Sequence, residues 1–78
     1  MKEKLINYVY DNIDLDEVQF TFGNMCIERS NLMHTNPKLY YKISDLVDDF
    51  ISDNELTENW FEETFFDIED VFEYIINK

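Results

Sequence analysis

Seventy-eight residues with a formal net charge of −12 allow one small acidic domain, residues 1–78, and exclude a basic nucleic-acid-binding surface as its main feature. Seven Phe, five Tyr and one Trp provide enough aromatic surface for a core, which argues against disorder. A single Cys excludes an internal disulfide, and no apolar run approaches the roughly 20 residues of a membrane span. We therefore expect a cytoplasmic protein with no membrane partner and no direct contact with nucleic acid.

The chain begins with a pattern typical of an amphipathic helix over residues 2–13. Its apolar side chains recur at steps of three and four residues, at Leu5, Ile6, Val9, Tyr10 and Ile13. This pattern differs from the continuous apolar core of a signal peptide. Residues 14–16, Asp-Leu-Asp, are expected to connect this helix to the next element.

Residues 18–22, Val-Gln-Phe-Thr-Phe, alternate between apolar and polar side chains, which is typical of a β-strand. Gly23-Asn24 follows, and Gly at the first central position suits the type II′ turn of a hairpin. Met25 and Ile27 then resume the alternation. We predict a β-hairpin over residues 18–29, followed by a polar connection over residues 31–38.

Residues 39–43, Leu-Tyr-Tyr-Lys-Ile, fit two structures. Their alternating apolar positions favour a third antiparallel strand, after which Ser44 would cap a helix over residues 45–52. Alternatively, the apolar positions from 39 to 50 share one face of a helix that is capped by Asn36 and has Pro37 at its first position. We prefer the strand, because a lone two-stranded hairpin is only marginally stable.

Two helix-cap signatures follow. Thr57 can cap a helix at 58–66 and Asp67 can cap one at 68–76, although one helix over 58–77 also fits the pattern. The element order predicts an α+β domain. It would consist of an N-terminal helix, a β-hairpin with a third antiparallel strand, and two or three C-terminal helices packed on one sheet face.

The acidic residues are concentrated in the second half of the chain. Residues 43–77 contain twelve carboxylates and no Lys or Arg, whereas residues 1–42 contain six acidic and five basic side chains. Such a surface repels itself, since like charges at i,i+4 on a helix cost about 0.2–0.5 kcal/mol per pair. It attracts basic protein surfaces, although a solvated face that keeps an aromatic-rich protein in solution would have the same composition.

We expect these acids to bind a partner. If residues 58–73 form one helix, Glu58, Glu62, Glu69 and Glu73 lie along one edge over roughly 22 Å, which imitates a row of phosphates. Trp60 is either an interface anchor among these acids or part of the core. The candidate partner-binding residues are Asp45, Asp48, Asp49, Glu58, Glu62, Glu69, Asp70, Glu73 and Trp60.

No pattern of a metal site, a cofactor site or a catalytic site stands out. Gly23 would place Val18 first in an EF-hand loop, where a carboxylate is required. Cys26 and His34 are the only residues of their types, so they cannot complete a zinc site. No nucleophile–base arrangement is present, and we expect a protein that is not an enzyme and needs no cofactor or metal.

The chain resembles a known family in three features. They are the order of its expected elements, the run Tyr41-Lys42-Ile43-Ser44 leading to residues 47–52, and the acid-rich aromatic stretch 60–74. These features are similar to those of the small acidic phage anti-CRISPR proteins that inhibit Cas9. The resemblance is to members built as a helix, three strands and two helices, which act as DNA mimics at the site for the protospacer-adjacent motif.

This resemblance implies an inhibitor that acts in the host cytoplasm on the basic nucleic-acid groove of a defence protein, in the first place a Cas effector. Other DNA mimics, which target restriction enzymes, glycosylases or histone-like proteins, would need a similar surface. The alternative is a small antitoxin, immunity or adaptor protein whose acidic face binds one basic protein. The sequence does not separate these functions.

Overall fold

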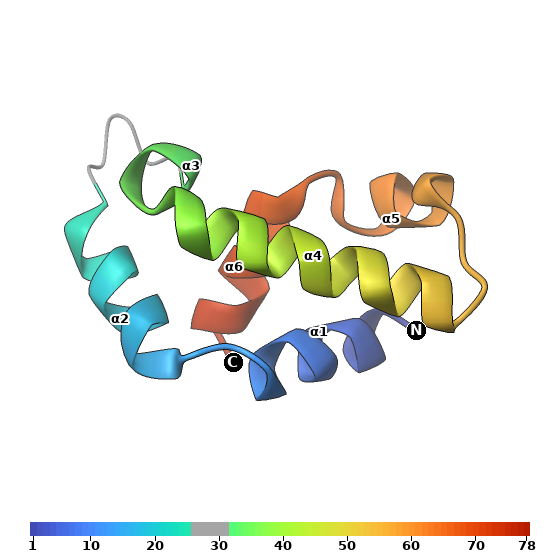
Figure 1. Ribbon diagram of the computed structural model, residues 1–78, viewed down its shortest axis with the longest axis horizontal. Coiled ribbons are helices and arrows are strands. Elements are labelled where there is room, and N and C mark those ends of the chain that lie inside the picture. The colour runs from blue at the N-terminus through green and yellow to red at the C-terminus, as the bar shows by residue number, and fades with distance from the viewer. Residues whose placement is uncertain (26–31) are drawn as a thin grey trace.

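The computed structural model describes residues 1–25 and 32–78. Of these residues 81% are helical and none lies in a strand, so the predicted α+β fold is wrong. The helices are α1 Lys2–Asp11, α2 Leu15–Asn24, α3 Leu32–Thr35, α4 Pro37–Asp53, α5 Glu58–Phe65 and α6 Ile68–Ile76 (Figure 1).

Helix α4 organises the molecule, which measures 35 × 23 × 20 Å. It packs against α1, α3 and α6, while α2 packs against α3 and α6, and α5 against α6 (Figure 1). The apolar stripe of α4 explains this position, because its inward side chains recur at helical spacing and are all buried. They are Leu39, Ile43, Leu46, Val47 and Phe50.

Helices α1 and α6 supply most of the remaining core. The stripe predicted for α1 is confirmed at Leu5, Ile6 and Val9, which are buried. In α6 the same spacing buries four further side chains, Ile68, Val71, Phe72 and Ile75. The core is therefore formed by the faces of helices and involves no sheet among the described residues.

The predicted strand at residues 18–22 is instead the middle of α2. Asp14 caps this helix, since its carboxylate accepts hydrogen bonds from the backbone N–H groups of Asp16 (2.9 Å) and Glu17 (3.4 Å). Burial then follows the helical period, because Val18 and Thr21 are buried while Phe20 is exposed. The alternation that favoured a strand extends over only five residues, and it is a weaker signal than the Asp14 cap, which favours a helix.

The turn predicted at Gly23-Asn24 is also wrong. A type II′ turn needs positive φ at its first central residue, and Gly23 has none because it lies in the last turn of α2. The second predicted strand falls mostly on residues 26–29, which lie outside the described residues together with the start of the predicted 31–38 connection. The described part of that connection contains α3, whose Leu32 is fully buried.

The preferred strand at residues 39–43 is wrong, and the alternative helix is confirmed. Pro37 opens α4, and the Asn36 side-chain oxygen accepts a hydrogen bond of 3.1 Å from the Leu39 N–H. Ser44 lies inside this helix and caps nothing. The N–H groups of the first turn have no partner within the helix, so proline, which lacks an N–H, costs nothing there. In a strand it would remove a hydrogen bond, and Pro37 therefore favours the start of a helix.

Residues 58–77 form two helices, as the two cap signatures predicted. Thr57 accepts a hydrogen bond from the Trp60 N–H (3.2 Å), and Asp67 accepts one from the Asp70 N–H (3.1 Å). Between them Phe66 has φ 74° and ψ −60°, and the Asp67 N–H donates to the Phe65 carbonyl at 3.0 Å. This is a γ-turn in its rarer form, and it ends α5 abruptly.

Four of the helices in the described residues end in the same way, with an Asn whose side-chain amide donates to the carbonyl four residues earlier. These bonds run from Asn12 to Tyr8, Asn24 to Phe20, Asn54 to Phe50 and Asn77 to Glu73. A helix leaves its last carbonyls without partners, and Lys or Arg side chains often supply them. In this chain the neutral side-chain amide of Asn donates to one of these carbonyls, so the helix end gains a hydrogen bond without gaining a positive charge.

Candidate functional site

The acidic surface spreads over the outward faces of α4, α5 and α6. On α4, Asp45, Asp48 and Asp49 are exposed at spacings of three and four residues, opposite the buried stripe. On the other two helices Glu58, Glu62 and Glu73 are exposed and Asp70 is half-buried; these helices bury only their apolar faces.

The carboxylates at the C-terminal ends of the helices oppose the electrostatics of the helices that carry them, whereas Glu58, Glu69 and Asp70 lie in first turns, where the macrodipole favours a negative charge. The C-terminal end of a helix is partially negative and favours cations by about 0.3–1 kcal/mol each. The last turns of α1, α2, α4, α5 and α6 contain no basic residue. Carboxylates occupy several of these turns instead, at Asp11, Asp53, Glu62, Glu63 and Glu73. The fold therefore carries them at a cost in stability.

Three of the predicted acids come together between α4 and α5. Asp48, Glu58 and Glu62 line a shallow groove of about 180 Å³ together with Phe61 and apolar side chains of α4. The helix pair brings Asp48 beside residues 10 to 14 positions later in the chain. Asp45 and Asp49 are exposed on α4 but are not among the residues that line this groove.

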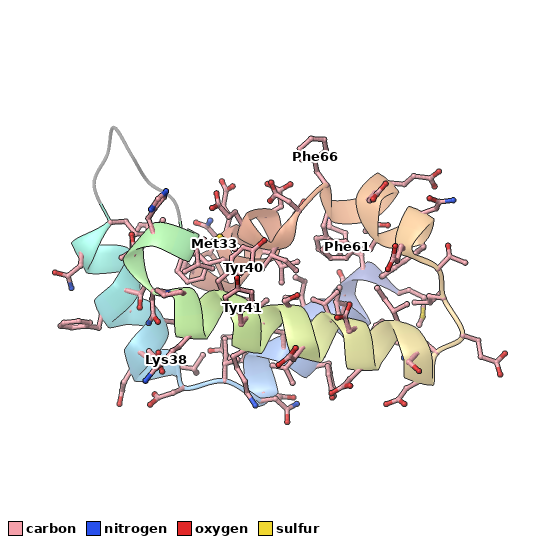
Figure 2. All side chains as sticks on the ribbon, turned by 45° about the horizontal axis from the view of Figure 1, so that its top comes forward. Met33, Lys38, Tyr40, Tyr41, Phe61 and Phe66 are labelled. Carbon is pink, nitrogen blue, oxygen red and sulfur yellow. The ribbon has the colours of Figure 1, made fainter. Side chains whose placement is uncertain are left out.

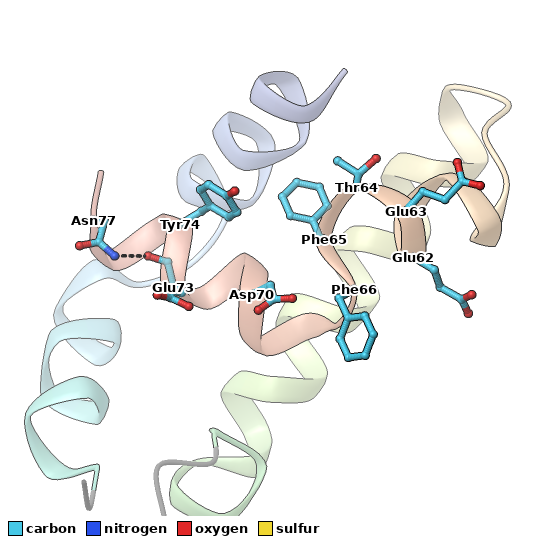
Figure 3. Close-up of a pocket in the computed structure, with 9 residues that line it drawn as sticks. All are labelled: Glu62, Glu63, Thr64, Phe65, Phe66, Asp70, Glu73, Tyr74 and Asn77. Atoms are coloured by element: carbon cyan, nitrogen blue, oxygen red, sulfur yellow. Dashed lines mark hydrogen bonds between the residues drawn. The ribbon is translucent and has the colours of Figure 1, made fainter.

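A larger open groove, of about 610 Å³, lies between the end of α5 and α6 (Figure 3). Its acidic lining consists of Glu62, Glu63, Asp70 and Glu73, and none of the described residues that line it is Lys or Arg. Its aromatic lining comes from Phe65, Phe66 and Tyr74. Glu62 borders both grooves, so the acids of α4 continue into those of α6.

Phe66 is the most exposed large apolar side chain described, with 79% of its surface accessible. The γ-turn reverses the side-chain direction between neighbours, so Phe65 is buried against Tyr74, at 5.7 Å between ring centroids, while Phe66 points outward. Figure 2 shows Phe66 projecting away from the ribbon and Phe61 lying closer to α4. No pattern in the sequence distinguishes the exposed Phe66 from its buried neighbour Phe65.

Two predicted site residues have structural contacts. The Glu69 carboxylate accepts a hydrogen bond of 3.1 Å from the Leu32 N–H at the start of α3. Trp60 is half-buried and its ring lies 6.3 Å from the rings of both Phe50 and Phe65. Trp60 therefore belongs to the aromatic packing between α4 and α5, and Phe66 occupies the exposed aromatic position.

The expected row of Glu58, Glu62, Glu69 and Glu73 depended on a single straight helix, and this condition is not met. The turn at Phe66 separates the first two from the last two. Glu62, Glu63, Asp70 and Glu73 instead follow a curve around the corner between α5 and α6, and the Phe66 side chain lies at the bend (Figure 3).

Within residues 1–25 and 32–78, no group of three or more His, Cys, Asp or Glu side chains is arranged to hold a metal ion. Cys26 lies outside these ranges, and His34 is exposed on α3. No helix of the described chain is both long enough and apolar enough to cross a membrane.

Comparison with known proteins adds no relative. No protein-family model, curated protein or solved structure matches the chain. The function is therefore argued from the surface itself.

Proposed function

We propose that this protein is an acidic inhibitor that binds the basic nucleic-acid groove of a defence protein, with a Cas effector as the first candidate, and keeps nucleic acid out of it. One observation carries the proposal: the band of carboxylates over α4, α5 and α6, in a stretch of 35 residues without Lys or Arg. Such a band attracts a basic groove over long range and competes with phosphates for the same cations.

The positions of the acids favour binding over a purely solubilising role. A surface that only keeps a protein in solution can mix both signs and place cations at the ends of helices. Here Asp53 and Glu73 lie in the last turns of α4 and α6, where they oppose the macrodipole. Charges retained at a cost in stability are more readily explained by a partner that offsets the cost.

The proposal rests on this surface and not on the order of elements. The three strands expected from the resemblance to Cas9-inhibiting anti-CRISPR proteins are not found in the described residues. Asp48, Glu58 and Glu62 are exposed on the all-helical fold that replaces the expected α+β fold. A helical scaffold can present carboxylates to a basic groove as well as a sheet can, because recognition depends on the positions of the charges.

The test is competition for a defined partner. Purified guide-loaded Cas9 is mixed with labelled target DNA, and the protein is titrated in while DNA binding is followed by fluorescence anisotropy. We expect the protein to displace the DNA, excess DNA to displace the protein, and the affinity to fall as salt rises. The same assay applies to DNA-binding proteins captured from a host lysate. Simultaneous binding of protein and DNA to every such partner would contradict the proposal.

Matched charge reversals locate the surface. The set Asp48→Lys, Glu58→Lys and Glu62→Gln should weaken binding stepwise while circular dichroism stays helical. The set Glu3→Lys, Asp11→Lys and Asp14→Asn changes acids on the α1–α2 side, where Lys2 and Lys4 already dilute the charge, and should have a smaller effect. Equal loss from both sets would show that only net charge matters.

A second function, that of an immunity protein or antitoxin that binds one basic protein, is favoured by Phe66. An exposed aromatic side chain among acids is typical of a compact protein interface and is not needed to imitate phosphates. The competition assay separates the two, because an immunity protein need not exclude DNA.

A further inference from the structure

We propose that the groove between α5 and α6 receives an arginine side chain of the partner, stacked on the Phe66 ring and paired with the surrounding carboxylates. This inference rests on the proposed function, because it assumes a basic protein partner. It goes further by naming the side chain that the groove selects and the residue that selects it.

The groove is open to solvent and, at about 610 Å³, is large enough to admit a long side chain. Phe65 is buried and packs edge-on against Tyr74, so these two rings make a fixed wall. Phe66 stands at the turn, and its ring projects where an incoming side chain can reach its face (Figure 3).

The charge of the groove determines what can enter it. Glu62, Glu63, Asp70 and Glu73 supply four carboxylates to its lining. None of the described residues that line it is Lys or Arg, and the nearby Lys2 ammonium lies against the Tyr74 and Phe65 rings, at 4.2 Å and 5.9 Å from their centroids. An acidic or purely apolar occupant is therefore disfavoured. A cation with apolar surface satisfies both the carboxylates and the ring.

The protein itself pairs cations with aromatic rings. The Lys2 ammonium lies 4.2 Å from the centroid of the Tyr74 ring, and the Lys78 ammonium lies 5.4 Å from that of Tyr10. Within the described part of the chain, no cation and no second ring lies against Phe66. Phe66 is thus a highly exposed ring beside carboxylates, and none of the described cations of the chain covers it.

Arginine fits this position better than lysine. Its guanidinium is planar, stacks on an aromatic face and is less strongly hydrated than an ammonium group. While stacked, it can still donate two parallel hydrogen bonds to one carboxylate in its own plane. A lysine ammonium has the charge but not the planar surface of a guanidinium. It therefore pairs with the carboxylates but interacts less favourably with the Phe66 ring.

The test uses two peptides of equal length and charge, nona-arginine and nona-lysine, whose affinities for the protein are measured by isothermal titration calorimetry. We expect both to bind through the acidic band, and nona-arginine to bind at least about threefold more tightly. Phe66→Leu keeps an apolar side chain but removes the ring, so it should reduce this ratio and leave nona-lysine binding almost unchanged.

Phe20→Leu is the matched control. Phe20 is 73% exposed, on α2, and is not among the residues that line the groove. We expect it to leave the arginine preference intact, with circular dichroism confirming that both variants fold. The inference is overturned if the wild-type protein shows no preference, if Phe66→Leu retains it, or if Phe20→Leu reduces it equally.

The outcome is separable from that of the proposed function. If Glu62→Lys weakens both peptides alike and Phe66→Leu changes nothing, the acidic surface binds cations but the arginine site is wrong. If neither peptide binds at moderate salt, both proposals are contradicted.

Discussion

Two neighbouring phenylalanines have opposite environments. Phe65 is 3% exposed and Phe66 is 79% exposed, although nothing in the local sequence distinguishes them. The difference comes from one backbone angle, the positive φ of Phe66, which turns its side chain away from the core. The helical periodicity of apolar residues does not show which of the two is buried, because either Phe65 or Phe66 could be the last residue of the apolar stripe.

Burial of Phe72 should make it one of the residues on which folding depends. Phe72 is 3% exposed, so Phe72→Ala should lower the free energy of unfolding by about 3–5 kcal/mol. That loss approaches the whole stability of a small domain, and Phe72→Leu provides a milder variant that stays folded. Urea denaturation followed by circular dichroism measures both.

Phe20→Ala is the control for the core measurement. Its side chain is largely exposed, so the free energy of unfolding should change by no more than about 0.5 kcal/mol. A large loss at Phe20, or a negligible one at Phe72, would show that the core is not arranged as described.

At the scale of elements, the caps were more informative than the periodicity. The signatures at Thr57 and Asp67 predicted both C-terminal helices within about a residue, because a side-chain oxygen must satisfy free N–H groups at these positions. Asp14 offers the same signal for α2, at a position where the prediction of a connection is wrong. The alternation at 18–22 was too short to separate strand from helix, and the contacts that bury Thr21 are not visible in the sequence.

The candidate site was predictable in composition but not in shape. Asp48 and Glu62 were expected on an acidic exterior outside the apolar faces and both are exposed, while their role in binding a partner stays a prediction. Their arrangement depends on how α5 and α6 meet at Phe66, which is a tertiary feature. The bond from the Leu32 N–H to Glu69 joins residues 37 positions apart, so no local pattern could indicate it.

The end of α4 shows where this chain accepts a poor local conformation. The Leu56 N–H donates to the Ile51 carbonyl (2.9 Å) and the Glu55 N–H donates to the Ser52 carbonyl (3.3 Å), which together form a Schellman motif. Its left-handed position, normally Gly, is occupied by Glu55 with φ 55°. This places another exposed carboxylate beside the negative end of α4.

Glu55→Gly should therefore stabilise the protein. Glycine adopts positive φ without strain, and removal of a carboxylate relieves repulsion at the end of α4, for a combined gain of about 0.5–1 kcal/mol. Thermal and urea denaturation measure this. Glu55→Gln removes only the charge and separates the two causes. A loss of stability in Glu55→Gly would mean that Glu55 makes a favourable contact that outweighs the strain.

At the scale of the whole molecule, the charge of −12 acts over a small volume. The dimensions of 35 × 23 × 20 Å are comparable with the Debye length of about 30 Å at 0.01 M salt. At that ionic strength most carboxylates repel one another across the fold. At about 1 M salt the Debye length is about 3 Å, and only adjacent pairs still interact.

Salt should therefore have opposite effects on folding and binding. Between about 0.01 M and 1 M sodium chloride we expect the Tm to rise, because screening relieves self-repulsion in the folded state, while affinity for a basic partner falls. Scanning calorimetry measures the first and the competition assay the second. A variant with Glu55→Gln, Glu62→Gln and Glu63→Gln should start from a higher Tm and respond less to salt. A Tm that does not change with salt would show that the acids cost the fold little.

The packing of α1 against α6 has a consequence for synthesis in the cell. Helix α1 leaves the ribosome before α6, against which it packs in the finished fold (Figure 1). There the Lys2 ammonium donates a hydrogen bond to the Tyr74 hydroxyl. At about 5–20 residues per second, roughly 3–11 s separate the emergence of α1 from that of α6. During this time Leu5, Ile6 and Val9 lack part of their cover, and the nascent chain depends on α4 to shield them from chaperones and proteases.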